Sequence, residues 1–570
     1  MKLITGGPGS GKTQRLVDEV EARLKDGVSP YLLLATTFSR QAAAEISRRL
    51  GGDVAVKTVH GTAYWLIRLA RKARGDQVPK VISEDESLKM MERAAKEVGA
   101  RFLEPQAVIQ DMERIRAKGG RFEMLHPQAQ EMIQRYFQNL AAENSIDFTG
   151  ILEAAREELE DPKLRSFLQG LRLFVDEGQD LNPVTEWPIL EILSELAEEL
   201  VMLASPSQQI YGFRGANWQE LVAHFPSDMT IEGMRPNYRS TPEIVNTARP
   251  LAGPDASDMY AVRSSIGVPV KAVEATNPEM EADFVGRQIN EWIDCFQAID
   301  VPINQIAVLT RVHSQQNLLE IALRMRDIPY RMIGNGEGIF EREEARALLG
   351  YLRLAIDPMD DSVLETIVNF PPCGIGKRMR YKLRGDDLLN WDHLIKVLAN
   401  PEKWPPQVVQ RVHQILDLRE LFDQIAGRKL GLVDFVTNVA RLSQIPDFLY
   451  GEGDFAGAAA IEEVIELGQE FGRLSEFIRY LEEEVVRPSQ REGVQLATIH
   501  ASKGREWKAV LIPGFNDGLL PLEASDPGEE RNLAFVGMTR ANDRLAITMS
   551  RPLPVSPFLD RLPLEITRWP

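Results

Sequence analysis

The sequence has few cysteines, no long apolar run and fewer basic than acidic residues. Its 570 residues contain only two cysteines, Cys295 and Cys373, which stand far apart and in no metal-ligand spacing. A disulfide framework and a zinc site are therefore disfavoured, and a reducing compartment fits. No apolar run approaches the roughly 20 residues that span a bilayer, and the N-terminus does not fit a signal peptide. We expect a cytoplasmic protein with no membrane partner.

The charge balance is acidic, with 66 Lys and Arg against 84 Asp and Glu and a net charge of -18. Phosphate binding depends on Lys and Arg, so this balance by itself argues against a nucleic-acid partner. The average does not locate the charges, however. Acidic runs such as Glu482–Glu484 can lie on remote helical faces while basic residues line one groove. The composition lowers the expectation of nucleic-acid binding without excluding it.

What is present is an alternation of buried strands and helices. The hydrophobic content of 44% and charged content of 26% are typical of a globular protein, and the length indicates roughly three to five domains. The segment 39–50 predicts a helix with Ser39 as its N-cap. Short apolar runs predict buried strands of parallel sheets covered by helices, at 32–36, 171–175, 200–204, 305–309, 330–333, 495–498, 510–512 and 545–548.

Two long segments interrupt this alternation. Residues from about 66 to 148 and from about 357 to 489 have helical periodicity and few strand signals. No low-complexity segment and no repeat of solenoid period is present. The simplest interpretation is an α/β protein with two cores, each interrupted by a mainly helical insertion.

One glycine-rich loop matches the motif G-x-x-x-x-G-K-[ST] between an expected strand and an expected helix. Its glycines let backbone N–H groups surround the β- and γ-phosphates of a nucleotide, and the following helix directs its positive end toward them. Lys12 adds a point charge, and Thr13 offers a hydroxyl to Mg²⁺. The residues of this loop are Gly6, Gly7, Pro8, Gly9, Ser10, Gly11, Lys12 and Thr13.

An acidic pair supports the same interpretation. The apolar run 173–175 ends in Asp176 and Glu177. Asp176 can hold Mg²⁺, and Glu177 can polarise the attacking water as a general base. Together the two motifs define a P-loop NTPase, which still leaves kinases, transporter ATPases and GTPases open.

Seven further segments stand in order along nearly the whole chain. The acidic pair continues as D-E-G-Q-D at 176–180, which is much more specific than the pair alone. The other six are T-F-S-R-Q-A-A-A-E at 37–45, T-V-H-G-T at 58–62, Q-Q-I-Y-G-F-R-G-A at 208–216, N-Y-R-S at 237–240, T-I-H-A-S-K-G-R-E-W at 498–507 and E-E-R-N-L-A-F-V-G-M-T-R-A at 529–541. Together these segments resemble the motifs of the UvrD/Rep group of superfamily 1 DNA helicases.

The resemblance implies two RecA-like P-loop cores with parallel sheets, facing each other across an ATP cleft, and two mainly helical accessory domains. Both accessory domains are short for the group, and no nuclease domain or tail is expected after the last strand. The expected ranges are 1–65 and 149–222 for the first core, 66–148 for its insertion, 223–356 and 490–570 for the second core, and 357–489 for its insertion.

The resemblance also implies roles around ATP and Mg²⁺. Arg239 and Arg540 resemble arginine fingers of the second core, which stabilise charge on the γ-phosphate. Gln208 would sense that phosphate, Tyr238 would stack on adenine, and Glu506 would accept a hydrogen bond from the ribose. The expected catalytic set is Lys12, Glu177, Gln208, Arg239 and Arg540.

A site for single-stranded DNA is implied as well. Aromatic rings suit it, because every base has a π-face and stacking tolerates any sequence. For Phe38 and Phe213 the alternative is a place in the apolar core. The residues expected to contact DNA are Phe38, His60, Tyr211, Phe213, Arg214 and His500.

Two basic clusters leave alternatives open. Residues 374–382 form a glycine turn and a basic stretch, similar to a Gly-Ile-Gly turn of the family. Such a turn can clamp a duplex phosphate, but a solvated helix face is equally compatible. The same two alternatives apply to the cluster Arg68, Arg71, Lys72 and Arg74.

The chain departs from the family pattern near the phosphates and the base. Ala204 and Ser205 replace the usual Gly-Asp before the Q-x-I-Y motif, so a carboxylate that would organise the γ-phosphate region is missing and weaker coupling is expected. Gln14 replaces the usual arginine after the P-loop. Only five residues precede Gly6, which leaves no place for the adenine-reading glutamine motif, so we expect stacking on Tyr238 to carry adenine binding.

The sequence thus predicts an ATP-dependent DNA helicase that moves 3′ to 5′ on single-stranded DNA and unwinds duplex at single/double-strand junctions. Repair or replication, with loading or repair proteins as partners, is the expected setting. One alternative is a single-stranded DNA translocase that strips proteins and unwinds little without a partner. Another is a degenerate, ATP-binding structural subunit, against which the intact catalytic residues argue.

Overall fold

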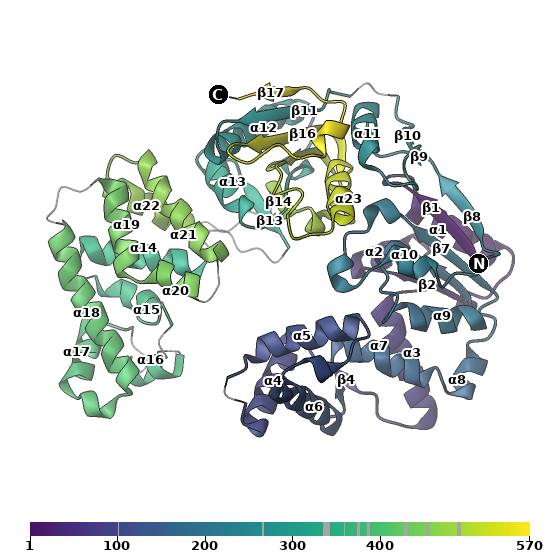
Figure 1. Cartoon of the computed structure of the whole chain (residues 1–570), viewed down its shortest axis with the longest axis horizontal. Helices are drawn as coiled ribbons and strands as arrows, with labels where there is room; N and C mark the ends of the chain where they lie inside the picture. The colour runs from purple at the N-terminus through teal and green to yellow at the C-terminus, as the bar shows by residue number, and fades with distance from the viewer. Residues whose placement is uncertain are drawn as a thin grey trace.

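The computed structural model describes residues 1–569 except 101, 265–266, 335–341, 358–359, 373–374, 376, 385–387, 427–430, 452–454 and 487–491. Two parallel β-sheets, each covered by helices, lie next to each other, and a helical domain extends from each (Figure 1). The domain of α14–α22 stands to one side of the second sheet, and α4–α6 lie below the first. No helix in the described part of the chain is long and apolar enough to cross a membrane.

The first core is built on a six-stranded sheet of order β3-β2-β6-β7-β1-β8, in which all neighbours are parallel. Successive residues of a strand face opposite layers, so Leu173 and Phe174 join two different buried clusters. Helices α1 and α2 pack on one face, and α3, α7 and α9 on the other. The elements are β1 (Lys2–Gly6), α1 (Lys12–Lys25), β2 (Leu33–Thr37), α2 (Arg40–Arg49), β3 (Ala55–Thr58), α3 (Val59–Arg74), α7 (Phe148–Glu158), α8 (Pro162–Phe167), β6 (Arg172–Val175), α9 (Trp187–Leu196), β7 (Glu199–Ala204), α10 (Trp218–Val222) and β8 (Thr230–Met234).

The second core has a seven-stranded parallel sheet of order β13-β14-β12-β15-β16-β11-β17. Helices α11 and α23 pack on one face, and α12 and α13 on the other. A two-stranded pair, β9 with β10, connects it to the first core. The elements are β9 (Pro236–Asn237), α11 (Pro242–Ala248), β10 (Tyr260–Ala261), β11 (Lys271–Ala275), α12 (Pro278–Gln297), β12 (Ile306–Thr310), α13 (Gln315–Arg324), β13 (Tyr330–Ile333), β14 (Val494–Thr498), β15 (Trp507–Ile512), α23 (Pro527–Met538), β16 (Ala541–Ser550) and β17 (Ile566–Arg568).

Each insertion has a hydrophobic core of its own. A small parallel pair, β4 (Lys80–Val81) with β5 (Ser145–Ile146), closes the base of the first insertion. Its helices are α4 (Glu84–Val98), α5 (Pro105–Ala117) and α6 (Pro127–Ala142). The second insertion contains α14 (Glu343–Ile356), α15 (Leu364–Ile367), α16 (Lys377–Arg384), α17 (Trp391–Ala399), α18 (Pro406–Ala426), α19 (Leu432–Leu442), α20 (Ile445–Gly451), α21 (Phe455–Leu467) and α22 (Leu474–Val486).

The predicted fold class is confirmed, and every predicted strand overlaps a strand of one of the two sheets. The helix predicted at 39–50 is α2, whose Ser39 cap accepts a hydrogen bond from the Ala42 N–H at 3.1 Å. Strands that are buried on both faces of a sheet are continuous runs of β-branched and apolar residues. Such runs can be recognised in the sequence alone, which explains this agreement.

Three expected domain boundaries differ from the structure. Strand β8 pairs with β1 in the first sheet, although residues after 222 were assigned to the second core. Helix α3 continues to Arg74, and its Leu66 and Ile67 pack in the first core rather than in the insertion. Helix α14 packs in the core of the second insertion, although residues to 356 were assigned to the second core. In each case tertiary packing decides the partner, which periodicity along the chain does not encode.

Candidate functional site

The P-loop connects β1 to α1 and curls around the ammonium group of Lys12. Lys12 is buried, and its Nζ donates hydrogen bonds of 3.0 Å to the carbonyl oxygens of both Gly6 and Gly7. Gly9 and Gly11 have φ angles of 68° and 83°, a left-handed conformation that suits glycine. Burial outweighs the nearby acids and lowers the pKa of Lys12, because a cation is costly away from water. An anionic ligand would offset this cost.

Asp176 and Glu177 follow β6 directly and face the same loop. Burial, and then the charge of Glu177, raise the pKa of Asp176 to about 7. Burial also acts to raise the pKa of Glu177, but Lys503 and Lys12 outweigh it, so the net direction is down. Glu177 is therefore the ionised member of the pair.

The same corner fits a divalent cation. The Thr13 hydroxyl donates to Oδ2 of Asp176 at 3.3 Å, so a hydroxyl oxygen and a carboxylate face each other. Burial, and then the neighbouring charge of Glu177, raise the pKa of Asp176, so a cation at this corner would stabilise its ionised form. Hard oxygen ligands and uncompensated negative charge are what Mg²⁺ binds. Thr13 and Asp176 are therefore suited to hold it.

Arg540 reaches this space from the second core. Its Nε donates to the carbonyl oxygen of Val536 at 3.1 Å, and its Nη1 to that of Arg505 at 3.3 Å. Burial, and then the charge of Arg239, lower the pKa of Arg540 to about 9. Among the acidic residues that the structure describes, none forms an ion pair with Arg540. Its buried charge is thus open to an anion in the cavity.

Arg239 and Tyr238 lie against the P-loop. The Asn237 side chain before them donates to the carbonyl oxygen of Pro8 at 2.7 Å, which holds the segment in place. The Nε of Arg239 donates to Oε2 of Glu506 at 2.5 Å. Glu506, expected at the ribose, is thus the ion-pair partner of Arg239, while Tyr238 is 59% exposed.

These groups line one cavity of about 840 Å³ between the two cores. The structure brings the whole predicted catalytic set together there, and Gly6 and Gly7 lie behind it as the partners of Lys12. Predicted residues in the lining are Pro8, Gly9, Ser10, Gly11, Lys12, Thr13, Asp176, Glu177 and Gln208 from the first core, and Tyr238, Arg239, Glu506 and Arg540 from the second.

Two further residues belong to this site but were not predicted. The Nε2 of Gln179 donates to Oε2 of Glu177 at 2.6 Å, which orients that carboxylate. The Nζ of Lys503 donates to Oδ1 of Asp180 at 2.6 Å and to the carbonyl oxygen of Gln208 at 2.8 Å. Both stand inside motifs quoted above, so a signal was present, but their partners come from the fold. Helix α2 also lines the cavity. Its first residues stand inside the motif at 37–45, from which only Phe38 was predicted to have a role.

A row of rings, Phe38, Tyr211, Phe213 and His500, continues from this cavity. Phe38 stacks on Tyr211 with 4.9 Å between centroids, Tyr211 contacts Phe213 at 6.0 Å, and Phe213 contacts His500 at 5.6 Å. The Arg214 guanidinium lies over Tyr211 and Phe213. Phe213 is 67% exposed, which excludes the core alternative for it, whereas Phe38 is half-buried. Burial lowers the pKa of His500 to about 4, so its ring is neutral near pH 7.

His60 is the one predicted DNA residue that the structure places outside this row. Its ring stacks on Phe148 with centroids 3.9 Å apart, and its Nδ1 lies 3.6 Å from Oε1 of Glu186. Burial lowers the pKa of His60 to about 4, so it is also neutral near pH 7. His60 and Phe148 form a second, separate stacked pair.

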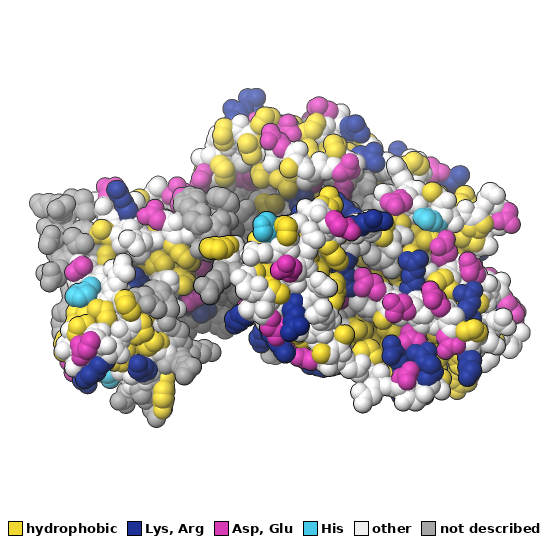
Figure 2. Space-filling model, turned by 60° about the horizontal axis from the view of Figure 1, so that its bottom comes forward, with side chains coloured by type: hydrophobic (Ala, Val, Ile, Leu, Met, Phe, Trp, Pro, Cys, Tyr) yellow, Lys and Arg dark blue, Asp and Glu magenta, His cyan; other side chains and the backbone are white. Residues whose placement is uncertain are grey.

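The two basic clusters differ from a simple phosphate clamp. In the second-named cluster, Arg71 and Arg74 each form an ion pair with Glu158 at 2.6 Å, which favours the helix-face alternative over a phosphate clamp. In the first-named cluster, residues 374 and 376 and the side chains of 377 and 378 lie outside the described residues, and Arg380 lies 3.7 Å from Glu365. Acidic and basic side chains are interspersed on the face drawn in Figure 2.

Fold and site together define a P-loop NTPase of two facing RecA-like cores, with the nucleotide cavity between them. Residues 1–227 match the UvrD/REP helicase N-terminal domain, and residues 233–396 and 438–552 match the UvrD-like helicase C-terminal domain. The chain belongs to the UvrD/REP family of DNA helicases, which are ATP-hydrolysing enzymes.

Similar proteins cover nearly the whole chain. DNA helicase II of Escherichia coli (strain K12) is 29% identical over 613 residues, which are 96% of this chain and 82% of that protein. DNA helicase II of Salmonella typhimurium shows the same identity and coverage. The ATP-dependent DNA helicase PcrA of Staphylococcus epidermidis is 25% identical over 608 residues, 96% of this chain and 81% of its own length.

Proposed function

We propose that this enzyme moves 3′ to 5′ along single-stranded DNA and separates duplex at single/double-strand junctions, in DNA repair or replication. The observation that supports this best is that one short segment carries both sites. Gln208 lines the nucleotide cavity, and Tyr211 and Phe213 belong to the row of rings three and five residues later. Only a few residues of the chain therefore separate the group that would contact the γ-phosphate from the rings that would contact the bases.

At the nucleotide, Glu177 would take the proton of the attacking water, since it is the ionised acid of the pair and Gln179 orients it. Lys12 and Arg540 would stabilise the charge that develops on the transferred phosphoryl group. Both are buried cations, so their interaction with an anion is only weakly screened. Mg²⁺ held by Thr13 and Asp176 would neutralise charge on the phosphate oxygens.

At the DNA, the exposed ring of Phe213 would stack on a base, and Arg214 would contact the backbone. Lys503 would link the two sites, because its ammonium group binds the Gln208 carbonyl and also lies 4.8 Å from the centre of the Tyr211 ring. Loss of the γ-phosphate would open the cleft between the cores and shift these contacts relative to one another. Repetition of that cycle moves the protein along the strand.

Strand separation on tailed duplexes tests this proposal. With ATP and Mg²⁺, a duplex with a 3′ single-stranded tail should be unwound, and one with a 5′ tail or blunt ends should not. The Glu177→Gln variant serves as a control that binds ATP without turnover. Unwinding only from a 5′ tail would reverse the proposed direction. ATP turnover with displacement of a bound protein but no unwinding would instead identify a translocase that strips proteins.

A further inference from the structure

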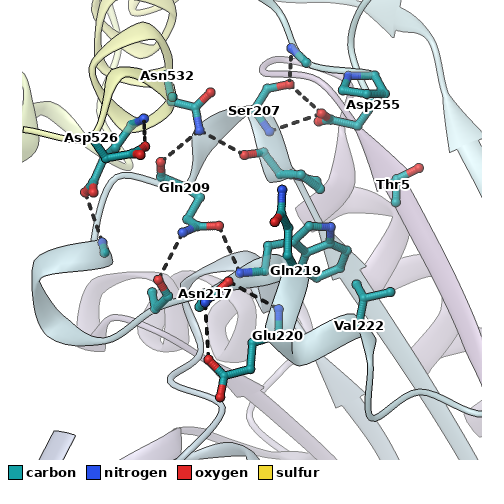
Figure 3. Close-up of a pocket in the computed structure, with 18 of the residues that line it drawn as sticks. Thr5, Ser207, Gln209, Asn217, Gln219, Glu220, Val222, Asp255, Asp526 and Asn532 are labelled. Carbon is teal, nitrogen blue, oxygen red and sulfur yellow. Dashed lines mark hydrogen bonds between the residues drawn. The ribbon is translucent and has the colours of Figure 1, made fainter. Parts of the chain in front are cut away.

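The turn that carries Gln208 is held by the second core. Ser205 and Ser207 are buried, and both bind Asp255, which follows α11 in the other core. The Ser207 N–H donates to Oδ1 of Asp255 at 3.1 Å, its hydroxyl donates to the same oxygen, and the Ser205 hydroxyl donates to Oδ2 at 3.3 Å. Figure 3 shows Asp255 facing Ser207 with the two bonds from Ser207 drawn.

Other second-core groups hold the same turn. The N–H of Gly253 donates to the Ser207 hydroxyl at 2.9 Å, so that hydroxyl both accepts and donates across the boundary. The Asn532 side chain donates to the carbonyl oxygens of Pro206 and Gln209 at 3.3 and 3.1 Å (Figure 3). Six hydrogen bonds besides those of Lys503 thus fix a short first-core turn from the opposite core, and Asp255 accepts three of them.

Gln208 itself makes few bonds that would hold its side chain. It is buried and lines the nucleotide cavity, and its Nε2 has no hydrogen-bond partner among the described residues. The position of this amide is therefore decided by the backbone of the turn. A buried donor without a partner is costly, and a phosphate oxygen in the cavity would satisfy it.

We propose that Asp255 is a positioning residue that holds Gln208 toward the γ-phosphate and ties this contact to the approach of the two cores. The sequence lacks a carboxylate at position 205, and weaker coupling was expected for that reason. Asp255 supplies a carboxylate to the same turn from the other core. This inference rests on the proposed role of Gln208.

The test uses three single variants of the full chain and the double variant Asp255→Ala/Ser207→Ala. Asp255→Ala removes all three acceptor contacts. Asp255→Asn keeps Oδ1 and thus the two bonds from Ser207, and its amide can donate to Ser205. Ser207→Ala removes the hydroxyl that joins Gly253 to Asp255. Asp258→Asn is the matched control, because Asp258 is exposed and, among the residues that the structure describes, its ion-pair partner is Arg235 on the surface, at 2.7 Å.

Asp255→Ala should lower kcat for ATP about tenfold or more, because three hydrogen bonds to the turn are lost together, with KM changed less than about twofold. Asp255→Asn and the Asp258 control should stay close to the parent. Ser207→Ala removes only one of the three bonds to Asp255, so its loss of kcat should be smaller than that of Asp255→Ala. The double variant Asp255→Ala/Ser207→Ala should be little worse than Asp255→Ala alone, because the bond between the two side chains is already lost. Binding of a non-hydrolysable ATP analogue at unchanged stoichiometry shows that the loss is not misfolding.

Turnover is measured with and without single-stranded DNA, which separates this inference from the proposed function. Loss of turnover in both conditions supports the role of Asp255 even where DNA gives no stimulation. Parent-like kcat in Asp255→Ala overturns it. Equal losses in Asp255→Asn and Asp255→Ala also overturn it, because they would show that the charge matters and not the hydrogen-bond geometry.

Discussion

Asp176 and Glu177 are adjacent carboxylates whose surroundings shift their pKa values in opposite directions. Asp176 is the more buried, and its pKa is raised to about 7, while Lys503 and Lys12 lower the pKa of Glu177. A water-activating base has to be ionised and near the phosphates. Glu177, whose pKa is lowered, meets both conditions before a cation binds.

Glu177→Gln should therefore keep ATP binding and lower kcat by a factor of about 10² or more, the usual contribution of a general base. The amide keeps the size of the side chain and its contact with Gln179, so the fold is not expected to change. Steady-state turnover and equilibrium binding of ATP check this. Glu198→Gln, a surface carboxylate paired with Arg172, should behave as the parent. Undiminished turnover in Glu177→Gln removes this residue as the base.

Arg540→Ala should lower kcat by a factor of about 10³, as the loss of an arginine finger does. The thermal unfolding temperature should not fall, since a buried charge without an ion-pair partner is costly to the folded state. Arg551→Ala is the control, because Arg551 directly follows strand β16, which Arg540 directly precedes, and it pairs with Glu274 on the surface. A variant that loses stability and activity in parallel would show that Arg540 is a structural residue.

At the scale of elements, the segment between β7 and α10 connects the nucleotide cavity to the row of rings. It is irregular, with two short 3₁₀ turns at Pro206–Gln208 and Gly212–Arg214, and it lies across the boundary of the two cores. The first turn faces the nucleotide cavity and the second presents Phe213. An irregular segment held from both sides can transmit a small shift that a helix or strand would resist.

Phe213→Ala should lower affinity for single-stranded DNA about tenfold, because base stacking contributes about 1–3 kcal/mol per base. Turnover without DNA should stay as in the parent. Phe167→Ala is a close match, since Phe167 on α8 is 65% exposed and Phe213 is 67% exposed. Fluorescence titration with a labelled oligonucleotide measures both. Equal affinity in the Phe213 variant and the parent would refute base stacking by this ring.

For the whole molecule, the net charge of -18 means that DNA binding has to be local. Acidic and basic side chains are mixed on the face in Figure 2, and many arginines are in ion pairs, as Arg71 is with Glu158. Arg214 differs, because its guanidinium lies over two rings. Arg214 beside the rings, and not the average charge, should set the salt dependence.

Arg214→Gln should therefore reduce the slope of log Kd against log salt concentration by about 0.7, the effect of one phosphate contact with a single strand. Arg71→Gln should leave the slope unchanged, because its charge is already compensated. Titrations over a range of potassium chloride concentrations measure the slopes. A smaller slope in the Arg71 variant would instead show that the cluster of Arg71 contacts a DNA phosphate.

The sequence by itself determined the strands, the P-loop, the acidic pair and the order of the motifs. These depend on local burial and on residue types at fixed spacing, which a chain shows directly. It did not determine that β8 joins the first sheet, that α14 joins the second insertion, or that Asp255 takes the place of a carboxylate at 205. Asp255 binds Ser207 across 48 positions of the chain, and such a contact depends on how two cores pack. Packing follows from side-chain shape and hydrogen bonding in three dimensions, so only the tertiary structure decided it.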